Sequence, residues 1–339
     1  MLINSIRTIK LIIATAIVLG FAYPAYSVET TSKTEALNQA LAQAETKAKS
    51  ENETRKLPND DEDSFRQKLG SRITTEKEDE PPSELDTLIR FMPSRGAEAQ
   101  SGSVGLVVSE SEYNYQFNAF GKLPVQLGVG TQYIGINNST SVALPAHLTT
   151  VSFGGNVTFP FFNLDKTYFR IEATPSFYTD NWNINSKTFR IPINTFAIYQ
   201  PNDTWTFILG MHFFPSGVLN SKIGPVAGLI YKPNDKLIFN LVPPKPNILY
   251  MVNDKLGVFG EFGMTDEQFL VTKDGQKNVV LLYNENRLGT GVLYKFNKFL
   301  ESTFSVGAVF NGYMKYKESL GKVVLKNGLY TEVRTELYW

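Results

Sequence analysis

Few residues in this chain could carry out catalysis. The sequence has two histidines, His147 and His212, and no cysteine, which excludes disulfides, thiolate metal sites and cysteine nucleophiles. His147 and Ser152 could form a hydrolytic pair, but an odd separation places two residues on opposite faces of a strand. No GxSxG, HExxH or phosphate-binding loop pattern occurs. We therefore expect no enzyme, no metal site and no cofactor, and we expect His147 to be an exposed loop residue.

Charged residues form a second candidate group, because they alternate with apolar ones. Arg170 and Glu172, for example, alternate with Phe169 and Ile171. If the apolar face of such a segment meets lipid, the polar face points into a lumen. This reasoning predicts as lumen-lining residues Arg170, Glu172, Arg190, His212, Glu261, Arg287, Glu301, Glu332, Arg334 and Glu336. Charges of both signs predict cross-strand ion pairs or a water-filled pore without strong charge selectivity. A polar plug that keeps a narrow barrel closed is the alternative.

The elements that would hold these residues are β-strands. From about residue 102 onward, apolar positions recur with a period of two in many segments, such as 205–213. Repeated alternation over segments of roughly ten residues is typical of a transmembrane β-barrel. A soluble β-sandwich also alternates, but the polar faces here hold many Gly, Asn, Gln and charged residues. We predict an all-β, antiparallel up-and-down barrel of about 12–14 strands, since bacterial barrels have even strand numbers.

Four predicted turns share a tyrosine that is followed three positions later by an asparagine. The segments YQPNDTWTF and YKPNDKLIF are near copies, and they begin at Tyr199 and Tyr231; looser copies begin at Tyr250 and Tyr294. Asparagine accepts hydrogen bonds from a turning backbone, and tyrosine favours the boundary between hydrocarbon and headgroups. We expect these turns to be the short connections on one rim, with the four tyrosines as interface anchors. Longer polar connections should lie on the other rim.

The N-terminal third differs in composition from the rest. Arg7 and Lys10 precede an apolar run at 11–22, and small residues follow before Val28, which predicts a cleaved signal peptide over residues 1–27. Residues 28–100 are rich in Ala, Glu, Lys and Gln and predict a helical or disordered polar segment, with a short helix at 85–94. A short coiled coil within it is the alternative. The barrel would then occupy residues 101–339.

The bulk composition limits the partners. The chain has 33 Lys plus Arg and 33 Asp plus Glu, so its net charge of zero argues against nucleic-acid binding. Aromatic residues are plentiful, yet the mean hydropathy of −0.17 is slightly polar. Strands with one apolar and one polar face have such a composition, whereas transmembrane helices need about 20 consecutive apolar residues.

The C-terminal strand resembles the signal that the outer-membrane assembly machinery recognises. It ends in an aromatic residue, Trp339, with Leu337 and Val333 at alternate positions before it. The 102–339 region looks like largely uncharacterised bacterial outer-membrane barrels with recurring Pro-Asn-Asp turns, which are similar to porin-like proteins of the phenol-degradation type. The resemblance implies an outer-membrane location, contact with lipid and with the assembly machinery, and a porin-like channel for small solutes. The alternatives are a barrel that anchors or binds through its loops or its N-terminal segment and, as the weakest, an outer-membrane hydrolase.

Overall fold

The structure is a computed structural model that describes residues 82–120, 123–161, 164–181, 186–214, 223–317 and 320–339. The expected signal peptide, residues 1–27, and residues 28–81 of the expected polar segment lie outside these ranges. Their assignments remain predictions.

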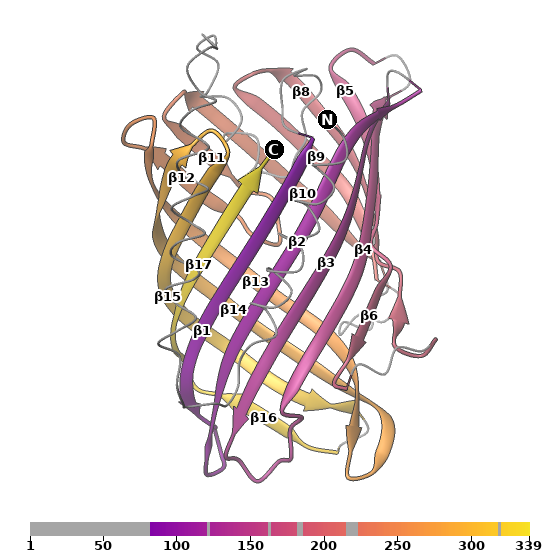
Figure 1. The fold of residues 1–339 in the computed structure, drawn as a ribbon, viewed down its shortest axis with the longest axis vertical. Coiled ribbons are helices and arrows are strands. Elements are labelled where there is room, and N and C mark those ends of the chain that lie inside the picture. The colour runs from indigo at the N-terminus through magenta and orange to yellow at the C-terminus, as the bar shows by residue number, and fades with distance from the viewer. Residues whose placement is uncertain (1–81, 121–122, 162–163, 182–185, 215–222, 318–319) are drawn as a thin grey trace, which may run out of the picture. The chain divides into compact units, whose positions relative to one another are not determined.

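The described residues form one sheet that closes into a barrel, antiparallel except for one parallel bridge between β6 and β13 (Figure 1). The first strand, β1, pairs with β2 on one side and with the last strand, β17, on the other, so the sheet has no free end at the seam. Three strands of the wall are interrupted (β5–β6, β7–β8 and β16–β17), which gives a wall of 14 strands and confirms the predicted fold class. The segments are β1 (Ser83–Gly96), β2 (Ser103–Ala119), β3 (Leu123–Asn138), β4 (His147–Pro160), β5 (Thr167–Ala173), β6 (Ser176–Thr179), β7 (Phe189–Arg190), β8 (Ile193–Asn202), β9 (Trp205–Phe213), β10 (Ile223–Asn234), β11 (Leu237–Asn240), β12 (Asn247–Met251), β13 (Leu256–Lys273), β14 (Gln276–Asn297), β15 (Leu300–Tyr316), β16 (Lys322–Leu325) and β17 (Gly328–Tyr338).

Strand β1 corrects the predicted start of the barrel. The barrel begins at Ser83 instead of residue 101, and residues 85–94, for which we predicted a short helix, are part of β1. The outward side chains of Ile89 and Phe91 are exposed, while the inward side chains of Leu88 and Met92 are buried. Because both faces of this strand are apolar here, its sequence does not show the period of two that marks the later strands.

One end of the barrel holds both strand termini, and we call it the terminal end. Ser83 and Trp339 exchange two backbone hydrogen bonds there, each of 3.1 Å. The four predicted short turns lie at this end, and in each the asparagine Oδ1 accepts backbone N–H bonds: Asn202 from Thr204 and Trp205, Asn234 from Lys236 and Leu237, Asn253 from Lys255 and Leu256, and Asn297 from Phe299. The predicted role of asparagine in these turns is confirmed.

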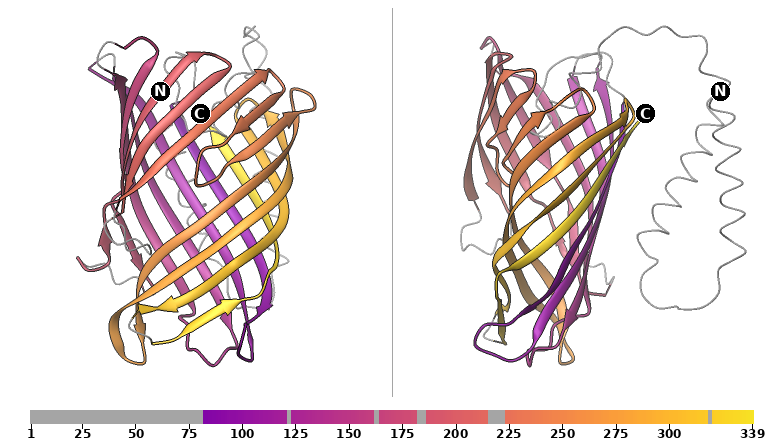
Figure 2. Two further views of the ribbon diagram at one scale, coloured as in Figure 1. Left: turned by 180° about the vertical axis from the view of Figure 1, so that it is seen from behind. Right: turned by 90° about the vertical axis from the view of Figure 1, so that its left-hand side faces the viewer.

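The opposite end, the distal end, carries connections that the sequence predicted to be the longer ones. Among them are the β3–β4 loop at 139–146 and the β15–β16 connection, which lie at the lower end of the barrel in Figure 1. Figure 2 shows the same barrel from behind and from the side, with its strands steeply tilted.

The outer face of the barrel is apolar along its strands. Its exposed large side chains come from strands all around the wall and include Ile89, Val107, Leu127, Phe153, Leu209, Leu288 and Val333. An exposed apolar surface that continues around a closed barrel matches the hydrocarbon of a bilayer. No helix in the described part of the chain is long and apolar enough to cross a membrane.

The inner face changes character along the barrel. Toward the terminal end, the inward positions of β2 and β3 are polar, as at Glu112 and Gln126; toward the distal end they are Val108, Leu106 and Ile134, all buried. These distal residues belong to an apolar cluster that also includes Phe269, Leu281, Tyr283, Val309 and Met314 from the facing part of the wall. Side chains therefore fill the distal half of the interior.

The wall itself explains this filling. Near the distal end, Thr179 of β6 pairs directly with Leu270 of β13, so β7 to β12 do not contribute to the ring at that level. A ring of fewer strands encloses a narrower space, which side chains can occupy completely. A second apolar cluster, with Ile198, Ile208 and Ile230, covers the inner face of the shorter strands β8 to β12.

Candidate functional site

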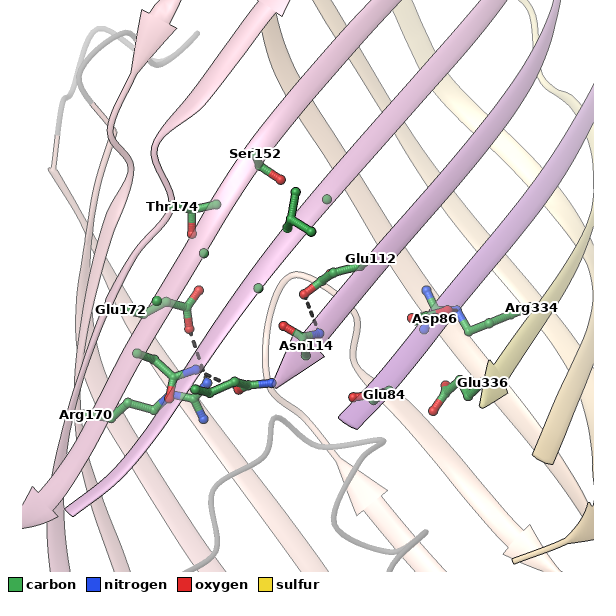
Figure 3. Close-up of a pocket in the computed structure, with 17 residues that line it drawn as sticks. Glu84, Asp86, Glu112, Asn114, Ser152, Arg170, Glu172, Thr174, Arg334 and Glu336 are labelled. Carbon is green, nitrogen blue, oxygen red and sulfur yellow. Dashed lines mark hydrogen bonds and ion pairs between the residues drawn. The ribbon is translucent and has the colours of Figure 1, made fainter. Parts of the chain in front are cut away.

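A polar cavity of about 460 Å³ lies inside the terminal half of the barrel, and we call it the chamber (Figure 3). Its lining comes from six neighbouring elements of the wall, β17 and β1 to β5, and from Thr174, which follows β5. The lining residues are Glu84, Asp86, Glu112, Asn114, Gln126, Gly128, Val129, Gly130, Ser152, Gly154, Gly155, Asn156, Arg170, Glu172, Thr174, Arg334 and Glu336. Apart from Val129 and the glycines, every lining residue has a polar side chain, as expected of a water-filled space.

Glycines make room for the chamber on β3 and β4. Gly128 and Gly154 are register partners, and Gly130 pairs with Ser152. A Cβ atom added at Gly154 would meet no atom within 4 Å, so this position borders open space. A Cβ atom at Gly128 would lie 2.3 Å from Asn114 Oδ1, so a larger residue there would displace the asparagine. The glycine residues therefore set the width of the chamber.

Two ion pairs fix the arginines of the chamber. Arg170 Nη2 lies 3.5 Å from Glu172 Oε2, and Arg334 Nε lies 3.7 Å from Asp86 Oδ1 across the β1–β17 seam. Two arginines against five carboxylates leave the lining with a formal charge of −3. This differs from the near balance expected from the sequence, because three of the five carboxylates (Glu84, Asp86 and Glu112) were not among the predicted lumen residues.

A hydrogen-bonded chain leads from the chamber to His212. Asn194 Nδ2 donates to Glu172 Oε1 at 3.2 Å, and Asn194 Oδ1 lies 2.5 Å from His212 Nδ1. Because Asn194 Oδ1 can only accept, Nδ1 of His212 carries the proton in this pair. His212 thus faces inward beside Glu172, as predicted, in a hydrogen-bonded arrangement that fixes its orientation.

A second layer of polar residues separates the chamber from the apolar cluster. Gln132 Nε2 donates to Glu110 at 3.3 Å and to Glu267 of β13 at 3.1 Å, while its Oε1 accepts from Thr150. Next to this layer, the buried guanidinium of Arg90 lies 2.6 Å from Glu332. This layer is formed by three register partners on β2, β3 and β4: Glu110, Gln132 and Thr150. Two residues farther along each strand toward the distal end, the inward-facing register partners are apolar: Val108, Ile134 and Leu148. The polar chamber therefore ends at the tier of Gln132.

The ten predicted lumen residues separate into groups. Arg170, Glu172, Arg334 and Glu336 meet in the chamber. The others have different partners: Glu332 binds Arg90, Glu301 accepts from Tyr338, Glu261 accepts from Tyr330 and Ser305, Arg287 binds Glu285 and Thr265, and Arg190 donates to the carbonyls of Lys187 and Phe189. Most of the predicted charges therefore stabilise the wall, and four of them line the cavity.

Sequence reasoning missed Glu84 and Asp86 because they lie on β1, which was not recognised as a strand. Glu110 and Glu112 could have been found. They continue, in steps of two, the polar face that Asn114 and Gln116 mark on β2. Extending that face by two further positions would have added both carboxylates to the candidates.

The predicted rim and assembly residues lie on the outer face. The side chains of Tyr199, Tyr250 and Tyr294 are exposed, and Tyr231 is partly buried because its ring stacks on Trp205 at 4.1 Å. Val333 is exposed on β17, and Trp339 stacks on Tyr113 of β2 at 5.8 Å. The alternation read from the C-terminal sequence therefore gives the correct faces of β17.

The two residues of the possible hydrolytic pair have separate surroundings. His147, which we expected to be an exposed loop residue, is instead the first residue of β4 and is partly buried. It stacks on Tyr133 with ring centroids 5.6 Å apart, whereas Ser152 lines the chamber. Within the described residues, no group of three or more His, Asp or Glu side chains is arranged to hold a metal ion.

Comparison with known proteins finds structural similarity only. No protein-family model and no curated protein matches this sequence. Among solved structures, an outer membrane channel from Pseudomonas putida F1 aligns with a TM-score of 0.43 at 8% identity, over 78% of this chain and 100% of the other. LpxR from Salmonella typhimurium aligns with a TM-score of 0.37 at 7% identity, over 76% and 100%. The Pseudomonas putida toluene transporter TodX aligns with a TM-score of 0.34 at 9% identity, over 77% and 89%. The barrel assignment rests on the strand pairing, independently of these similarities.

Proposed function

We propose that this chain is a bacterial outer-membrane β-barrel that lets small solutes cross the membrane. The observation that supports this most directly is the polar chamber of about 460 Å³, enclosed by a barrel whose outer face is apolar. A polar space inside an apolar wall provides water and hydrogen-bonding groups where the bilayer has none. The chamber is large enough for several water molecules or one small solute.

The location follows from the same reasoning. The protein would be exported by a signal peptide at 1–27, and the assembly machinery would recognise Val333, Leu337 and Trp339. The terminal end would face the periplasm, since its short turns match the periplasmic turns of bacterial barrels. Tyr199, Tyr231, Tyr250 and Tyr294 would then anchor the periplasmic rim in the headgroup region. We further propose membership of the barrel group with recurring Pro-Asn-Asp turns, which the four asparagine turns support.

The filled distal half determines what kind of channel this would be. Beyond Gln132, packed side chains occupy the described interior: the distal apolar cluster and the buried ion pairs that Glu285 forms with Arg95 and Arg287. Passage therefore requires the distal side chains or loops to move, so conductance should occur in brief openings.

Solute flux into liposomes tests this proposal. The mature protein, folded and reconstituted, should admit small polar solutes and exclude large oligosaccharides. Liposomes with heat-denatured protein serve as the control for leakage. A heat-modifiable, correctly inserted barrel that admits no small solute under any ionic condition would contradict the proposal.

The filled distal half also favours one other function: a barrel that anchors or binds and passes nothing. In that case, flux would be absent while removal of residues 28–81 would abolish the biological phenotype. Normal flux together with an unchanged phenotype after that deletion would exclude the anchor role. A hydrolase is not supported, because His147 and Ser152 have separate surroundings.

A further inference from the structure

The β3–β4 loop at 139–146 contacts a strand that is not its neighbour in the wall. In the wall, β3 is separated from β15 by β2, β1 and the interrupted strand β16–β17. Nevertheless, Tyr316 at the end of β15 donates its hydroxyl hydrogen to the carbonyl of Ala143 in this loop at 2.8 Å. A side chain of one wall segment thus holds the middle of a loop that belongs to another.

The loop is also packed onto the apolar cluster below it. Val142 and Leu144 contact the buried residues of the distal cluster, and so does Leu320 from the β15–β16 connection. Because the cluster includes inward side chains from both sides of the wall, the two loop residues cover apolar surface that would otherwise face the distal solvent.

Hydrogen bonds from Asn138 and from the neighbouring β1–β2 turn fix the conformation of the loop. Asn138 Nδ2 donates to the Val142 carbonyl at 2.8 Å, and Asn138 Oδ1 accepts from the backbone and hydroxyl of Thr140. Ser141 donates to Gln100 of the β1–β2 turn at 3.2 Å. On the far side, the Tyr316 hydroxyl donates the hydrogen bond that connects the described loop to β15.

We propose that residues 139–146 form a lid over the distal mouth of the lumen and that Tyr316 is its latch. Opening would break one hydrogen bond and withdraw Val142 and Leu144 from the cluster, while Asn138 and Gln100 hold the base of the loop. This inference rests on the proposed channel function, because a lid has a role only where something passes.

The latch can be removed without changing the apolar packing. Tyr316→Phe deletes only the hydroxyl group, and Tyr313→Phe, on the same strand, is the matched control. We expect faster amide hydrogen exchange at 139–146 and more frequent channel openings for Tyr316→Phe, and neither change for Tyr313→Phe. Unchanged exchange of the loop in Tyr316→Phe would overturn the inference, and this measurement does not depend on conductance.

The lid can also be locked. A Cβ atom built at Gly321 lies 3.9 Å from Val142 Cβ, which is within the range that a disulfide needs, and the chain has no cysteine of its own. In the double variant Val142→Cys, Gly321→Cys, the oxidised protein should open rarely and the reduced protein should recover. Gly321 has a φ of +126°, so cysteine strains the backbone there, and both states must be measured on the same variant.

The outcomes separate the two proposals. If the oxidised form, with its disulfide shown by mass spectrometry, conducts like the reduced form, the lid is wrong while the channel stands. If the wild type, the reduced double variant and Tyr316→Phe all fail to conduct, the channel proposal fails, and the lid loses its role even where the loop exchanges faster.

Discussion

Gln132 and Glu267 are hydrogen-bonded across the barrel at 3.1 Å, although β3 and β13 are not neighbours in the wall. The same amide group of Gln132 also binds Glu110. This contact lies at the boundary between the polar chamber and the distal apolar cluster, and the buried charges of Arg95, Glu285 and Arg287 lie beyond it. Any solute that enters the chamber from the terminal end meets this boundary before the apolar cluster.

The chamber should favour cations. Its lining has a formal charge of −3, and charged rings in a pore attract ions of the opposite sign. We expect the reversal potential in a salt gradient to show preference for cations over anions. Replacing Glu84, Glu112 and Glu336 with glutamine should remove most of that preference.

The control for this experiment changes the same amount of charge elsewhere. Asp203, Asp235 and Asp254 are exposed in the turns of the terminal rim, outside the chamber lining. Their joint replacement with asparagine should leave the selectivity nearly unchanged, because exposed charges beyond about 10 Å are screened by salt. Equal shifts in the two triple variants would contradict a selectivity set by the chamber.

Gly154 should control the width of the chamber. Because a side chain there meets open space, Gly154→Leu should fold normally and fill part of the cavity. We expect lower conductance and slower flux of the larger solutes. Gly155→Leu is the matched control: the backbone of Gly155 borders the chamber, but its added Cβ lies 3.5 Å from the outward side chain of Leu127, so the new side chain would point out of the barrel. Identical conductance of both variants would mean that solutes do not use this space.

Replacing only one partner of the buried ion pair between Arg90 and Glu332 should lower the stability of the barrel strongly. Removing one partner leaves a buried, uncompensated charge, which typically costs about 3–5 kcal/mol. Arg90→Met should therefore lower the urea midpoint of unfolding strongly, as measured by gel mobility. The double variant Arg90→Met, Glu332→Leu should regain most of the loss. A double variant as unstable as the single one would show that the pair itself provides the stability.

Trp339 should be needed for assembly and for closing the seam. Its backbone exchanges hydrogen bonds with Ser83, and its ring stacks on Tyr113 two strands away. We expect Trp339→Asp to reduce the heat-modifiable, inserted fraction, and Trp339→Phe to retain it. Normal insertion of Trp339→Asp would contradict this role.

The sequence predicted the fold well where each strand has one apolar and one polar face. Along β17, the alternation of Val333 with Glu332 and Arg334 predicted the two faces correctly, and the four asparagine turns lie together at one end of the barrel. It failed on β1, where Leu88 and Met92 face inward against the distal cluster and the pattern of two is lost. Patterns within one strand report the faces of that strand and not what lies across the barrel.

For the same reason, the sequence predicted only part of the candidate site. Arg170, Glu172, Arg334 and Glu336 were placed correctly inside the barrel. The sequence could not indicate that Thr179 would pair with Leu270, because a contact between distant strands leaves no local pattern. This contact narrows the ring, and it explains why apolar side chains occupy an interior that the sequence predicted to be polar throughout.

Single-channel recording of the mature protein in planar bilayers tests the central claim most directly. We expect discrete openings in potassium chloride, with a reversal potential that shows cation preference, and smaller steps for Gly154→Leu than for Gly155→Leu. A correctly folded, inserted barrel that shows no conductance steps over a wide voltage range would contradict the channel.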